Sequence, residues 1–220
     1  MDKYFKTQNS YYIWMAFYMV IVPFFTISSV FLLKNISIVI FVLTFFLTLS
    51  YSFFLAKKEI NKKSLYMQNV LSILGSMALG FIGSFIMTKI PILFWIWLIY
   101  VIIMDSYNFT NIGKKTKAAK LIKNPEMVSR LSINLPIPFY ENLVPVIGVG
   151  DLSYFILIVI TTAKLCENQF FWYTGIAIIL GQIVNAIIFL SCHKKRWYKG
   201  IPATVFPGVF SLLMILYFNL

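Results

Sequence analysis

Two acidic residues, Asp105 and Asp151, are embedded in the long apolar stretches YVIIMDSYNF and PVIGVGDLSYFILIV. A charged side chain at the centre of a membrane helix costs about 2.5–3.5 kcal/mol, and neither stretch holds a Lys, Arg or His to neutralise it. Two carboxylates in a low-dielectric site cannot both ionise, so a pair that meets there holds a shared proton. Such a pair activates water through its ionised member and polarises a carbonyl group through its protonated member.

The composition indicates that membrane helices must position these acids. Of the 220 residues, 60% are hydrophobic and 12% are charged, against about 45–50% apolar and about 25% charged residues in soluble domains. The net charge of +12 could suggest nucleic-acid binding, but the basic residues gather in loops on one side of the predicted membrane. The two cysteines and the single histidine have no zinc-ligand or disulfide spacing, so no metal or cofactor is expected.

The hydropathy pattern predicts an all-α polytopic membrane protein with about seven spans in a single domain. Residues 1–89 form a three-span N-terminal scaffold, and residues 90–220 form a four-span half with a cytoplasmic loop at about 111–142. One side of this topology receives every basic residue except Lys34, Lys89 and Lys164, so the N-terminus is expected in the cytoplasm and the C-terminus outside. The predicted spans are Tyr11–Leu33, Ile36–Ala56, Leu65–Met87, Pro91–Thr110, Leu143–Ala163, Phe170–Leu190 and Ile201–Leu220.

The fourth and fifth spans run antiparallel in this topology and carry both acids in the cytoplasmic half. At a helix rise of about 1.5 Å per residue, Asp105 lies about 8 Å from the inner end of its span. Counted from Leu143 on the same rise, Asp151 lies about 12 Å deep. The two carboxyl groups are therefore expected to face each other where these helices touch. The alternative, in which each acid is a protonated packing residue, stays open.

Several stretches near the acids depart from regular helix. Gly148 and Gly150 leave room beside the second acid for another chain to approach. The stretch LSINLPIPFY contains two prolines and predicts extended chain. Pro202 and Pro207 interrupt the start of the last span, and irregular backbone at membrane depth is tolerated where it is buried or lines a wet cavity.

Two further patterns concern helix surfaces. The stretch GKKTKAAKLIK predicts either a basic amphipathic helix at the inner leaflet or a solvated topology signal. Ser72, Ser76, Gly80 and Ser84 recur at four-residue spacing in the third span. Small residues on one face let helices approach closely, so this stripe is interpreted as a packing surface rather than a chemical site.

In chain order, the sequence has an Asp late in one span, a basic loop, G-x-G-D in the next span and Pro-Ala-Thr opening the last span. This combination resembles the presenilin and signal peptide peptidase family of intramembrane aspartyl proteases, over about residues 95–220. The resemblance implies that Asp105 and Asp151 are the catalytic dyad. It also implies that Pro202, Ala203 and Thr204 stand beside the active site, where the family has Pro-Ala-Leu. The segment at 133–140 would pair as a β-strand with unwound substrate, through Leu135, Pro136 and Ile137.

Three features depart from the family pattern. Met104 precedes the first acid where the family usually has tyrosine, and Thr204 replaces the leucine of the third motif. Seven spans are fewer than the family's nine, and losing an even number preserves the orientation of the catalytic half. The topology derived from the charges matches the presenilin branch rather than the inverted signal peptide peptidase branch.

The leading hypothesis is therefore an intramembrane aspartyl protease that cleaves transmembrane helical substrates within the bilayer. Prepilin and preflagellin peptidases also use G-x-G-D and two aspartates, but they lack the proline-alanine motif. A proton-coupled transporter or channel would use the acids as a relay and predicts internal repeats, of which none is convincing here. A non-catalytic relative that binds membrane helices is a further alternative. Richness in Ile, Lys, Asn and Phe hints at a prokaryotic plasma membrane, and no nucleic-acid partner is expected.

Overall fold

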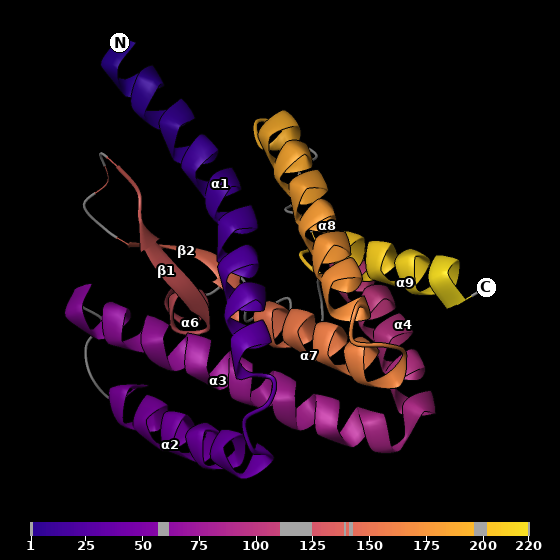
Figure 1. The fold of residues 1–220 in the computed structure, drawn as a ribbon. Helices are drawn as coiled ribbons and strands as arrows, with labels where there is room; N and C mark the ends of the chain where they lie inside the picture. Colours follow the sequence, from indigo (N-terminus) through magenta and orange to yellow (C-terminus); the bar gives the residue numbers. More distant parts are fainter. Residues whose placement is uncertain are drawn as a thin grey trace.

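The structure, a computed structural model, describes residues 2–56, 62–110, 125–138, 140, 143–195 and 202–219. This part of the chain is mostly helical and contains one two-stranded sheet (Figure 1). In chain order the elements are α1 (Asp2–Leu33), α2 (Ile38–Ala56), α3 (Lys62–Lys89), α4 (Pro91–Asn108), α6 (Pro125–Arg130), β1 (Ser132–Pro136), β2 (Leu143–Gly148), α7 (Val149–Leu165), α8 (Phe170–Cys192) and α9 (Val205–Asn219).

Four helices among the described residues are long and apolar enough to cross a membrane, as expected of a multi-pass membrane protein. Two shorter apolar helices lie at Ile38–Phe54 and Val205–Phe218. Seven crossings, and the side of the membrane on which each terminus lies, stay predictions. The predicted basic helix at 113–123 lies outside the described residues. The four long spans are Ser10–Leu33, Lys62–Lys89, Pro91–Asn108 and Phe170–Cys192.

The predicted fifth span, Leu143–Ala163, is wrong over its first six residues, which form β2. Pro145 has no N–H to give to a helix, and the valines and isoleucine around it fit a strand well. The helix α7 therefore begins at Val149. The last helix begins at Val205, within the predicted last span, and residues 202–204 before it are not helical, in agreement with the irregular backbone predicted there.

The strands β1 and β2 pair antiparallel, from Ser132 opposite Gly148 to Pro136 opposite Leu143, with a register shift after Ile133. The prediction of extended chain is therefore confirmed over β1. The sheet runs without a break into α7, since the Val149 N–H donates to the Leu131 carbonyl oxygen at 2.9 Å.

The sheet is fixed to α3 through one asparagine. The Asn134 N–H donates to Asn69 Oδ1 at 2.7 Å, and Asn69 Nδ2 donates to the Asn134 carbonyl oxygen at 2.5 Å. The backbone N–H and carbonyl oxygen of Asn134 therefore point away from β2. The Asn69 side chain makes the two hydrogen bonds that a neighbouring strand would otherwise make. This contact occupies the edge of β1 that faces α3.

The helix α7 is the centre of the core, and it packs along α3 (Figure 1). The small residues of α3 permit this approach, because a Cβ at Gly80 would stand 2.5 Å from Ile156 Cγ2. Ser76 Oγ donates to the Val149 carbonyl oxygen at 3.0 Å and so ties α3 to the start of α7. These contacts confirm that the stripe of small residues is a packing surface.

The helices α8 and α9 also pack against each other closely. A Cβ at Gly181 of α8 would overlap backbone atoms of Pro207, so glycine is required at that crossing. The three residues that precede α9 are thereby held beside α8.

Candidate active site

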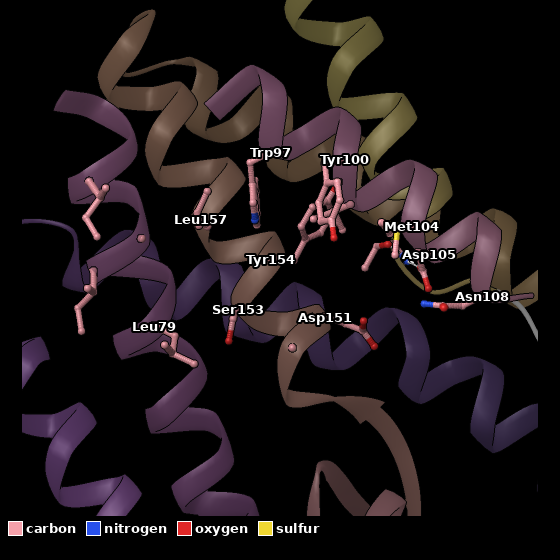
Figure 2. A pocket seen from close by; sticks show the side chains of 16 residues that line it. Leu79, Trp97, Tyr100, Met104, Asp105, Asn108, Asp151, Ser153, Tyr154 and Leu157 are labelled. Atoms are coloured by element: carbon pink, nitrogen blue, oxygen red, sulfur yellow. Dashed lines mark hydrogen bonds between the residues drawn. The ribbon is translucent and has the colours of Figure 1, made fainter. Parts of the chain in front are cut away.

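A cavity of about 570 Å³ lies between α3, α4 and the start of α7 and is lined by both embedded acids. Its lining is otherwise mainly apolar and aromatic, and among the described residues it includes no Lys, Arg or His. Figure 2 shows the carboxyl groups of Asp105 and Asp151 directed toward the same space from facing elements. The structure therefore brings together the two residues that the sequence singled out.

Asp105 lies in the last turn of α4, a helix that begins with Pro91 at its first position. The C-terminal end of a helix is an unfavourable place for a carboxylate, because the helix dipole is negative there. Thr204 compensates: its backbone N–H donates to Asp105 Oδ2 at 3.0 Å, and its hydroxyl donates to the same oxygen at 2.6 Å. One oxygen of Asp105 thus accepts two hydrogen bonds from the segment that precedes α9.

Thr204 is the residue immediately before α9, and its carbonyl oxygen accepts a hydrogen bond from the Gly208 N–H at 2.8 Å. A threonine at this position commonly caps its own helix, but here its hydroxyl binds Asp105 instead. The preceding Ala203 carbonyl oxygen accepts hydrogen bonds from Gln182 Nε2 and Asn185 Nδ2 of α8, both at 3.1 Å. The helix α8 therefore fixes the segment that holds Asp105.

Asp151 is the third residue of α7, and its position differs from the expectation. The sequence placed it about 12 Å along a continuous helix, whereas β2 replaces the first part of that helix. The helix N-terminus favours negative charge, so the first turn of α7 is a less costly place for this acid than the helix centre.

The two glycines of G-x-G-D have different surroundings. Gly148 is the extended residue before α7, and a Cβ there would stand 2.9 Å from Asp151 Oδ2. Glycine at this position therefore lets the carboxyl group turn back over the start of the helix. Gly150 is exposed, lines the cavity and has open space around it, so a substrate backbone has room beside the acid.

The predicted substrate contacts Leu135, Pro136 and Ile137 do not line the cavity. They lie in β1 and just after it, where the Pro136 carbonyl oxygen accepts a hydrogen bond from the Tyr18 hydroxyl at 2.9 Å and Ile137 is buried. Pro202 and Ala203 likewise stand outside the cavity lining, whereas the adjoining Thr204 belongs to it.

Besides Tyr100 and Ser153, sequence reasoning missed two polar residues that line the cavity, Asn108 and Tyr154. Each follows one of the acids by three residues, and residues three apart share a helix face. This spacing was the signal that could have identified both. Figure 2 shows Asn108 beside Asp105 and Tyr154 one turn beyond Asp151.

No protein-family model, curated protein or solved structure matches the chain. The described residues also contain no cluster of three or more His, Cys, Asp or Glu side chains that could hold a metal ion. The chemistry of the cavity therefore has to follow from its own residues.

The contact between Thr204 and Asp105 predicts a specific pattern of stabilities. Replacing Thr204 with valine keeps the side-chain shape and removes the hydroxyl, which should lower the free energy of unfolding by about 1.5–3 kcal/mol. Serine keeps the hydroxyl and should lose about 0.8 kcal/mol for the missing methyl group. Reversible denaturation in mild detergent measures both effects. In an Asp105→Asn background the valine substitution should cost less, since the two side chains are coupled. A T204V protein as stable as the wild type would contradict the contact.

Proposed function

We propose that this protein is an intramembrane aspartyl protease that hydrolyses peptide bonds in transmembrane helical substrates. The observation that carries the proposal is the meeting of Asp105 and Asp151 at one largely apolar cavity, with Thr204 bound to one carboxyl group. The motif order that resembles the presenilin and signal peptide peptidase family supports the same function.

The proposed reaction uses one proton shared between the two carboxyl groups. Water attacks the carbonyl carbon of the scissile bond and gives a proton to the ionised carboxylate, while the protonated carboxyl group gives its proton to the carbonyl oxygen. The resulting gem-diol then collapses as the C–N bond breaks. The newly protonated carboxyl group protonates the leaving nitrogen, and the other carboxylate recovers a proton from a diol hydroxyl. Both groups return to their starting states, and no cofactor takes part.

The hydrogen bonds at Asp105 suggest how the two roles divide. Both Thr204 donors bind Oδ2, so this oxygen is held as an acceptor and does not carry the shared proton. We assign Asp105 as the carboxylate that accepts the proton of water, and Asp151 as the group that protonates the carbonyl oxygen.

The sheet supplies a route for the unwound substrate. A peptide bond inside a helix is shielded, and an extended segment added to a sheet edge exposes it. Asn69 occupies the edge of β1 that faces α3. The strand β2 ends at Gly148 and leads directly into the first turn of α7. We therefore place the substrate strand along the outer edge of β2, which delivers it to the cavity beside Gly150.

The test is cleavage of single-span peptides by purified protein in bilayers, followed by mass spectrometry. Asp105→Asn and Asp151→Asn should each lower the rate at least about 100-fold, because each variant removes a general acid or base. Glu167→Gln, which alters an exposed carboxylate in the turn before α8, should cleave at the wild-type rate.

A wild-type protein that cuts none of the peptides, with aspartate variants that change proton flux in liposomes, would reject the protease in favour of a proton relay. If the wild type cleaves no peptide and the aspartate variants leave proton flux unchanged, catalysis is rejected and the helix-binding protein remains.

We further propose seven crossings in a prokaryotic plasma membrane, with the N-terminus in the cytoplasm. The two native cysteines test this topology, since Cys166 directly follows α7 and Cys192 ends α8, and both are partly exposed and outside any disulfide. In intact cells a membrane-impermeant thiol reagent should label the Cys192→Ser variant, through Cys166. It should leave the Cys166→Ser variant unlabelled until the cells are opened. Labelling of Cys192 but not of Cys166 in intact cells would show that the topology is the inverse of the one proposed.

A further inference from the structure

The hydroxyl group of Tyr154 is buried at the candidate site without a hydrogen-bond partner among the described residues. Tyr154 follows Asp151 by one helical turn, and its side chain is 4% exposed and lines the cavity. Removing a phenol hydroxyl from water without a new hydrogen bond costs free energy, and phenylalanine would fill the same space without that cost. Packing alone therefore does not explain the hydroxyl.

The hydroxyl lies where three helices meet. A Cβ at Gly208 of α9 would overlap the Tyr154 Oη and would stand 2.7 Å from Ile102 Cγ1 of α4. The Tyr154 ring also packs beside the Trp97 ring of α4, with centroids 5.0 Å apart. A side chain at position 208 would therefore collide with the Tyr154 hydroxyl of α7.

The same position is connected to Asp105. The Gly208 N–H donates to the Thr204 carbonyl oxygen, and Thr204 donates twice to Asp105 Oδ2. Tyr154 and Asp105 also line the same cavity. Both Thr204 donors restrain Oδ2, and a further donor to the other oxygen would fix the rotation of the carboxyl group toward Asp151.

We propose that Tyr154 is a positioning residue whose hydroxyl donates a hydrogen bond to the carboxyl group of Asp105 during catalysis. The inference rests on the proposed protease function and adds a third side chain to its machinery. The hydroxyl is inaccessible to water in the resting structure, so this hydrogen bond forms directly between the two side chains when substrate occupies the cavity. The free energy lost by burying the hydroxyl in the resting site is recovered when this hydrogen bond forms.

Tyr154→Phe removes the hydroxyl and nothing else. In the cleavage assay its kcat should fall about 10- to 100-fold, as expected for a misplaced catalytic group, while KM stays within about twofold because ground-state binding is unchanged. Its thermal midpoint should equal or exceed that of the wild type, because the lost hydroxyl has no partner in the resting protein. Lower activity without lower stability is a combination that a purely structural tyrosine would not give.

Thr161 supplies a matched control on the same helix. Its hydroxyl is also fully buried and without a partner among the described residues, but it does not line the cavity. Thr161→Val should keep the wild-type kcat with equal or higher stability. If Tyr154→Phe cleaves at the wild-type kcat, or if both variants lose kcat equally, the proposal is overturned.

Gly208→Ala provides an independent test, since the added Cβ would displace the hydroxyl. It should lower kcat in the wild-type background and lower it by a smaller factor in a Tyr154→Phe background, because part of the effect acts through the hydroxyl and the rest through Ile102. Additive losses would contradict a shared contact.

These outcomes are separable from the proposed function. Wild-type cleavage that both aspartate variants abolish upholds the protease, whatever Tyr154→Phe does. A wild-type protein that cleaves nothing rejects both proposals together.

Discussion

The hydrogen bonds from Thr204 to Asp105 join the start of α9 to the end of α4 across the cavity, and the candidate site depends on them. Asp105 lies at the C-terminal end of α4, where the helix dipole is unfavourable for a carboxylate. The apolar segments of the chain contain few other charged residues. The N-terminus of α9 supplies two donors and the favourable end of a second dipole. Much of the surrounding packing serves this contact, from the glycine at the α8–α9 crossing to the two amides of α8 that hold Ala203.

The second acid is held by the same physical means. Asp151 lies in the first turn of α7, behind a glycine that lets its carboxyl group fold back over the helix start. Each acid therefore lies close to a helix N-terminus, and no cation lines the cavity among the described residues. This arrangement suits a pair that must exchange a proton, because a neighbouring lysine or arginine would hold both carboxyl groups in the charged form.

The sequence was sufficient to predict that Asp105 and Asp151 line the same space, that several apolar helices are long enough to cross a membrane, and that extended chain precedes G-x-G-D. It could not predict how far that extension reached: Leu143–Gly148 are apolar enough for either a helix or a strand, and Pro145 was the signal for the strand. The resemblance placed Thr204 beside the active site, but its hydrogen bonds to Asp105 could not be predicted, because a contact between residues 99 positions apart depends on tertiary packing. Tyr154 and Asn69 were missed since a single polar residue on an apolar helix face resembles ordinary packing until its neighbours are known.

The central claim is that Asp105 and Asp151 act together on one carbon atom. The most direct measurement is the binding of a substrate peptide in which a secondary alcohol replaces the scissile carbonyl group, since this tetrahedral carbon mimics the intermediate. The wild type should bind this peptide at least about 100-fold more tightly than the unmodified peptide, and either aspartate-to-asparagine substitution should remove most of the difference. Equal affinity for the two peptides, or a preference that persists in both variants, would contradict a joint action of the two acids.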